Sequence, residues 1–201
     1  MNDFLKHLPD EIFQLAERCR AHVQKRFSLE LDFTGDTLSV LDFFVEELVK
    51  DENRGVAPLP GHSSRMNMIH LFAPTMGAYL GALLCRHFGG RFRHTEQEIS
   101  KWRFEFDTFF VRFNPVAIAA SVIAKQEVDG LPVLLISTPS LSQRLQERFD
   151  AAPEIPEDEF FSFCNFFESI QIANEFLIEV SRKDGKMNCS SENYDLLLGD
   201  R

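Results

Sequence analysis

Several signatures that would assign a function directly are missing from this 201-residue sequence. It has no P-loop, no G-x-G-x-x-G turn and no G-x-S-x-G elbow, so the common motifs of nucleotide binding and of serine hydrolases are absent. None of its four cysteines forms a C-x-x-C pair, which argues against a zinc knuckle or a dithiol redox centre. The first residues, MNDFLKHLPDE, show no charged segment followed by an apolar run, so we expect no secretory signal.

Polar aromatic residues are also scarce. The chain has one Trp and two Tyr against 21 Phe, and because Phe carries no polar group, most of these rings should lie in a core. Cys19, Cys85 and Cys164 fall in apolar helical patterns. We interpret them as reduced structural cysteines, which fits a cytoplasmic protein.

Excess positive charge is lacking too, since the formal net charge is −10. Acidic segments at both ends flank a mildly basic middle. This distribution argues against general nucleic-acid binding, which needs a basic domain. It still allows one local anion site or a basic protein partner.

The least polar long segment is residues 65–93. Ala73, Gly77, Gly81 and Cys85 recur every four residues, so on a helix they form a stripe of small side chains that lets another backbone approach closely. The pair Gly89-Gly90 should end this helix.

Residues 68–85 approach the length of a transmembrane helix, and their G-x-x-x-G spacing also suits a membrane helix pair. His70 and Pro74 interrupt the run, and the neighbouring segments are typical of soluble amphipathic helices. We therefore favour a buried central helix and expect no membrane partner.

The rest of the pattern predicts an α+β fold in which helices pack on a small, mostly antiparallel sheet within residues 90–136. Trp102, Phe104 and Phe106 alternate with charged residues, as in a half-buried strand. Asn114-Pro115 and Thr138-Pro139 both combine a capping residue with a first-turn proline, so each should begin a helix.

A long Phe-rich C-terminal helix should run from about residue 157 to 182. We expect one domain over residues 1–183, followed by a polar, flexible tail over residues 184–201.

One basic cluster is the candidate ligand site. It comprises Arg86, His87, Arg91, Arg93 and His94. Guanidinium groups suit carboxylate or phosphate, so the cluster predicts an anion site. The alternative is that these bases pair with the chain's own abundant acids. Because the histidines lack metal-ligand spacing, we predict no metal site. Because the motifs named above are missing, we predict no cofactor and no catalytic residue.

Acidic residues gather near positions 42–52 and 154–159. Such runs are usually solvated faces. Together they also create a negative field that can attract and mask a basic partner such as a nuclease.

Two stretches resemble a pattern found in uncharacterised bacterial proteins. The first is LDFT at residues 31–34, followed by SVLD at 39–42 and EEL at 46–48. The second is GAYLG at 77–81, followed by GGRF at 89–92. The chain departs from the pattern at Ala82, where the family has Glu, and at Phe92, where it has Trp. The resemblance implies a small bacterial α+β protein with no established activity, and it supplies no catalytic residues.

Our leading functional hypothesis is a non-enzymatic cytoplasmic interaction module with an acidic surface, of the kind used by immunity or neutralising proteins. The alternative is a small-ligand or anion-binding protein, or an enzyme, that uses the basic cluster. We expect a monomer or a homodimer, and exposed rings such as Phe161 and Phe166 would form the homodimer interface.

Overall fold

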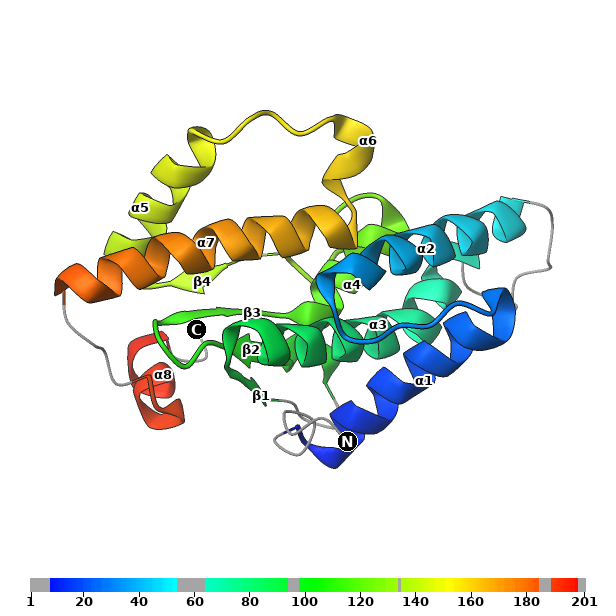
Figure 1. Cartoon of the computed structure of the whole chain (residues 1–201), viewed down its shortest axis with the longest axis horizontal. Helices are drawn as coiled ribbons and strands as arrows, with labels where there is room; N and C mark the ends of the chain where they lie inside the picture. Colours follow the sequence, from blue (N-terminus) through cyan, green and yellow to red (C-terminus); the bar gives the residue numbers. More distant parts are fainter. Residues whose placement is uncertain (1–7, 54–63, 94–97, 134, 185–188, 199–201) are drawn as a thin grey trace.

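The computed structural model describes residues 8–53, 64–93, 98–133, 135–184 and 189–198 (Figure 1). Helices pack on a small antiparallel sheet, which confirms the predicted α+β class. The longer helices are α1 (Asp10–Phe27), α2 (Leu38–Asn53), α3 (Ser64–Phe88), α4 (Pro115–Ala124), α5 (Pro139–Asp150), α7 (Phe163–Asp184) and α8 (Ser191–Leu198). The short helices are η2 (Gly35–Thr37), η3 (Ile99–Lys101) and α6 (Glu157–Phe160). The strands are β1 (Arg91–Arg93), β2 (Arg103–Glu105), β3 (Val111–Phe113) and β4 (Ile136–Ser137).

Both predicted helix starts with a first-turn proline are confirmed, but only Asn114 caps its helix, because the Thr138 side chain makes no capping hydrogen bond. Helix α4 begins at Pro115, and the Asn114 side chain accepts hydrogen bonds from the backbone N–H groups of Val116 (2.9 Å) and Ala117 (3.3 Å). Helix α5 begins at Pro139. In both cases the proline occupies a position whose N–H has no partner within the helix.

Helix α3 lies between α1 and α4 in the middle of the fold (Figure 1). Its stripe of small residues does permit close approach. A Cβ added at Gly77 would lie 2.7 Å from the Cα of Val116 at the start of α4, and one at Gly81 would lie 2.3 Å from the Phe92 ring of β1. The helix ends before Gly89, whose φ of +71° suits glycine.

The segment Arg65–Phe88 is long and apolar enough to cross a membrane, but length and composition alone are weak evidence. In this structure 67% of its apolar window is buried inside the fold. Met76, Tyr79 and Leu83 are fully covered. Its apolar character is therefore used to build a protein core.

The sheet has the order β1-β2-β3-β4 with antiparallel neighbours. The register aligns Phe92 with Phe104 and Phe104 with Phe113. Because aligned residues share a face, these three buried rings form the face that packs against the helical core. The opposite face carries charged residues.

The predicted helix over residues 157–182 is divided in two. Helix α6 ends at Phe160, and α7 begins at Phe163. The Asp42 carboxylate, which belongs to α2, accepts hydrogen bonds from the N–H groups of Phe163 (2.7 Å) and Cys164 (3.1 Å). A side chain from another helix thus caps α7, so α2 and the start of α7 are held together. Burial raises the pKa of Asp42, and these hydrogen bonds act in the opposite direction.

Within the segment where we expected a flexible tail, residues 184–201, the structure describes helix α8. Helix α8 lies against the sheet end of the molecule (Figure 1), and Tyr194 is fully buried. The Tyr194 hydroxyl accepts a hydrogen bond from the Val111 N–H (3.1 Å) and donates to the Phe109 carbonyl (2.6 Å). A polar sequence is therefore ordered by one aromatic anchor, because that hydroxyl satisfies backbone groups of the β2–β3 connection.

We expect Gly77→Ala to destabilise the protein by about 1–3 kcal/mol, because the added methyl group meets the α4 backbone, which cannot rotate away. On an open helix face the same change would stabilise by about 1 kcal/mol, so the sign is diagnostic. Urea unfolding followed by circular dichroism measures the effect. Leu71→Ala on the same helix is the control, since Leu71 is exposed and its loss should change stability by less than about 0.5 kcal/mol. A neutral or stabilising Gly77→Ala would contradict the close packing.

Candidate functional site

The charged face of the sheet is the strongest candidate for a functional site. The register aligns Arg91 with Glu105, and Glu105 with Arg112, across three strands. Arg93 and Arg103 form the next aligned pair on the same face. Within the described strands this surface, here called the arginine face, carries four guanidinium groups and one carboxylate.

Glu105 lies at the centre of the arginine face and is completely buried. One of its carboxylate oxygens lies 3.1 Å from Nε of Arg91, and the other lies 2.6 Å from Nε of Arg103 and 3.8 Å from the Arg93 guanidinium. The Glu105 carboxylate thus forms ion pairs with three arginines. Among the described residues, only Arg91 donates a hydrogen bond to it, while the oxygen that faces Arg103 and Arg93 has ion-pair contacts without a hydrogen bond. The nearby positive charges offset part of the cost of burying the carboxylate.

A second carboxylate comes from α8. Asp195 accepts hydrogen bonds from Arg93, at 3.2 and 3.0 Å to its two oxygens, and also from Arg103. The hydrogen bond from Arg103 and the charges of both arginines lower the pKa of Asp195. Arg91 in turn donates to the carbonyl of Cys189, just before α8. The arginine face and α8 are therefore joined by charge as well as by Tyr194.

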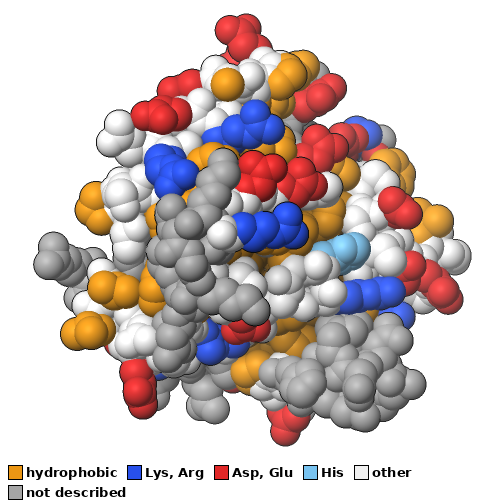
Figure 2. Space-filling model, turned by 60° about the vertical axis from the view of Figure 1, so that its left-hand side comes forward, with side chains coloured by type: hydrophobic (Ala, Val, Ile, Leu, Met, Phe, Trp, Pro, Cys, Tyr) orange, Lys and Arg blue, Asp and Glu red, His pale blue; other side chains and the backbone are white. Residues whose placement is uncertain are grey.

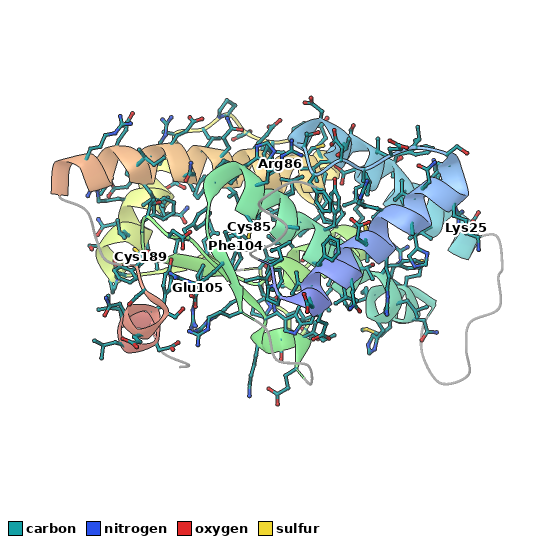
Figure 3. The ribbon with its side chains drawn as sticks, turned by 60° about the horizontal axis from the view of Figure 1, so that its bottom comes forward. Lys25, Cys85, Arg86, Phe104, Glu105 and Cys189 are labelled. Carbon is teal, nitrogen blue, oxygen red and sulfur yellow. The ribbon has the colours of Figure 1, made fainter. Side chains whose placement is uncertain are left out.

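The structure describes four of the five residues predicted to bind an anion, and it separates them. Arg91 and Arg93 lie together on the arginine face. Arg86 is exposed and donates to the backbone carbonyls of Asp32 (2.6 Å) and Phe33 (3.3 Å), well apart from Glu105 in Figure 3. The His87 ring meets the Phe167 ring edge-on, with centroids 5.4 Å apart.

The fifth predicted residue, His94, lies outside the described residues. The three described arginines of this set contact carboxylates or carbonyls of the same chain, which is the alternative that the sequence had left open.

Sequence reasoning missed Arg103, Glu105 and Asp195. The alternation of charges in Arg103 and Glu105 was visible, and it indicated a solvated strand face. The sequence did not reveal the strand register, which places Arg91 opposite Glu105. Nothing in the sequence links Asp195 to this site, because that contact spans more than 90 residues.

No activated cysteine is found among the described residues. Burial raises the pKa of Cys85 and Cys164 to about 12 and that of Cys189 to about 11, and it raises that of Cys19 further still. A thiol with a raised pKa is mostly protonated and so is a poor nucleophile. The described part of the chain also contains no group of three or more His, Cys, Asp or Glu side chains placed to hold a metal ion.

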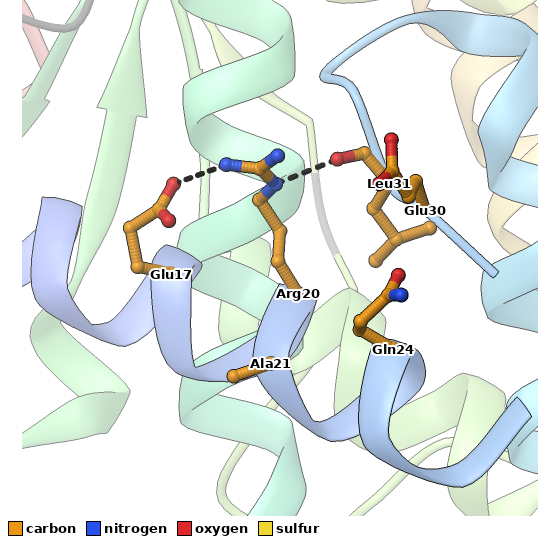
Figure 4. Close-up of a pocket in the computed structure, with 6 residues that line it drawn as sticks. All are labelled: Glu17, Arg20, Ala21, Gln24, Glu30 and Leu31. Atoms are coloured by element: carbon orange, nitrogen blue, oxygen red, sulfur yellow. Dashed lines mark hydrogen bonds and ion pairs between the residues drawn. The ribbon is translucent and has the colours of Figure 1, made fainter. Parts of the chain in front are cut away.

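A shallow pocket of about 310 Å³ lies beside α1 (Figure 4). Arg20 crosses it, donating to Glu17 (2.8 Å) and to the Leu31 carbonyl (2.6 Å). The remaining lining comes from Ala21, Gln24 and Glu30. Because these polar contacts tie α1 to the following loop, we interpret the pocket as a structural junction.

The stretches that resemble the bacterial pattern meet at Tyr79. The Tyr79 hydroxyl accepts a hydrogen bond from the Phe33 N–H and shares another with the Thr37 hydroxyl, each at 3.0 Å. The two rings of Phe33 and Tyr79 stack with centroids 4.8 Å apart. Asp32 accepts hydrogen bonds from Thr34 and Thr37. These residues hold the loop before α2 in place, so their visible role is structural.

Comparisons with models of known protein families, with curated proteins and with solved structures find no match for this chain. The site must therefore be interpreted from its own geometry. Figure 2 shows the end of the molecule that bears the C-terminal part of α7: basic side chains lie near its middle with acidic ones around them, and no broad area carries one sign of charge.

We expect Tyr79→Phe to destabilise the protein by about 1–3 kcal/mol, because the Phe33 N–H is buried and loses its acceptor. Chemical denaturation measures the loss. Thr37→Val, alone and combined with Tyr79→Phe, completes a double-mutant cycle. Strict additivity of the two changes would mean that the hydroxyl pair contributes nothing.

Glu105→Gln should also destabilise the protein, since it leaves three arginines without their shared carboxylate. We expect about 1–3 kcal/mol, less than the ~3–5 kcal/mol typical of fully buried pairs, because Arg91 and Arg93 are partly solvated. Thermal unfolding is the measurement. Glu98→Gln is the matched control, because Glu98 is exposed and pairs with its helical neighbour Lys101. Equal melting temperatures for the two variants would show that Glu105 does not organise this face.

Proposed function

We propose that this protein acts by binding a basic protein partner through an acidic surface rather than by catalysis. The observation that carries the proposal is the concentration of charge on three segments. Helix α2, residues 154–160 and helix α7 together hold thirteen acidic residues against three basic ones, a formal charge of −10 that equals that of the whole chain. We call these three segments the acidic ridge.

Contacts in the fold support treating the ridge as one surface. Asp42 of α2 caps the first turn of α7, and residues 154–160 lead directly into that turn. The three segments lie on the same side of the molecule in Figure 1. Glu157, Glu168 and Glu175 are all exposed there.

Exposed apolar side chains lie among these acidic residues, and they would give a partner an apolar surface to bury. Phe43 is 42% exposed, Ile155 is 42% exposed and Phe160 is 47% exposed. Aromatic anchors surrounded by charged residues are typical of protein interfaces. The charges would steer a basic partner, and the rings would supply burial.

Among the described residues, neither an activated thiol nor a metal cluster supports the enzyme alternative. The anion-binding alternative keeps one specific observation in its favour, the arginine face. There an incoming anion would have to replace Asp195.

The test is affinity capture from lysate of the source cell with the full chain and two charge variants. The ridge variant combines Glu157→Gln, Glu168→Gln and Glu175→Gln. The control combines Asp10→Asn, Glu98→Gln and Glu192→Gln, which removes the same charge from exposed sites outside the ridge.

We expect wild type and control to retain one basic protein in stoichiometric amount and the ridge variant to lose it, with capture weakening at high salt because exposed charges are screened. Native mass spectrometry gives the stoichiometry. Equal capture by all three proteins, or loss only in the control, would refute the proposal.

A further inference from the structure

Helix α8 covers the arginine face with a carboxylate of its own. Asp195 receives hydrogen bonds from both Arg93 and Arg103, and the Arg103 side chain is only 12% exposed beneath it. Two guanidinium groups converging on one carboxylate resemble the way in which proteins bind an anionic ligand. The α8 carboxylate thus occupies the place that such a ligand would take.

Helix α8 has a small apolar attachment among the described residues. Its buried apolar contacts form a small cluster of Phe110, Cys189 and Tyr194, separate from the main core. Leu196 and Leu197 of the same helix point outward and are 81% and 52% exposed, so they add little to docking. An element with a small apolar contact opens more readily than the core does.

The arginine face beneath α8 is itself built for an anion. Glu105 neutralises one charge of a face that carries four arginines, and Asp107 lies 3.6 Å from the Arg91 guanidinium at its edge. The sheet backbone fixes the spacing of the arginines. Without Asp195, Arg93 and Arg103 would lose their α8 partner while the sheet kept them side by side. A phosphoryl group presents more anionic oxygens than a carboxylate and suits paired guanidinium groups.

We propose that the arginine face is a binding site for a phosphoryl-bearing small molecule and that α8 closes it, with Asp195 standing in for the ligand. Ligand binding and α8 docking are then mutually exclusive. The apparent association constant is then the intrinsic constant multiplied by the fraction of molecules in which α8 is undocked. This inference goes beyond the proposed protein–protein function and does not depend on it.

The first experiment measures pyrophosphate binding by calorimetry at low salt with the full chain. Asp195→Asn and Tyr194→Phe should each tighten binding by about five- to tenfold over wild type, because each favours the open state. Tyr194→Phe is the decisive variant, since it weakens docking without changing any charge. Glu192→Gln is the matched control on the same helix, and it should bind like wild type.

Arg103→Gln in the Asp195→Asn background should abolish the binding. Hydrogen exchange gives an independent measure: saturating pyrophosphate should increase exchange of the α8 amides in wild type. Thermal unfolding of each variant verifies that it is folded.

Three results would each overturn the proposal. They are no pyrophosphate binding by Asp195→Asn, the same affinity for wild type and Tyr194→Phe, and α8 amides that stay protected in the saturated complex. Equal or tighter binding of succinate would overturn the phosphoryl assignment, because it would indicate a carboxylate site.

Discussion

The fold depends on how closely helix α3 approaches its neighbours. Gly77 allows the backbone of α4 to rest against α3, and Gly81 leaves room for the Phe92 ring of β1. Helix α4 and the sheet therefore pack against the same face of α3, at two glycines that are four residues apart. Once that contact exists, the apolar rings of the sheet must point toward α3. The charged side chains of the same strands must then point away, and this is how the arginine face arises.

The sequence predicted this core well because local signals carried it. The spacing of Ala73, Gly77 and Gly81 needs only helical periodicity, and Asn114-Pro115 needs only its own two residues to mark a helix start. The prediction was less successful where a distant group decides the outcome. The break before Phe163 depends on Asp42, which lies 121 residues earlier. The order of α8 depends on Tyr194, which no periodic pattern distinguishes from a residue in a flexible tail.

The candidate site follows the same division. Arg91 and Arg93 could be grouped from sequence because alternate residues of one strand share a face. Arg86 was grouped with them by proximity in sequence, but it belongs to α3 and donates to the loop before α2. Glu105 and Asp195 come from another strand and another helix. Recognising them required the strand register and the path of the chain after α7, and neither follows from local composition.

The position of Tyr194 has a consequence for how the chain is made. Its hydroxyl binds backbone groups of Phe109 and Val111, more than 80 residues earlier. During synthesis the β2–β3 hairpin leaves the ribosome long before its partner does. Until Tyr194 is made, those backbone groups must form hydrogen bonds with water or with another molecule. A variant that lacks Tyr194 would leave those backbone groups without this partner, so helix α8 completes the hydrogen bonding of a hairpin made much earlier in the chain.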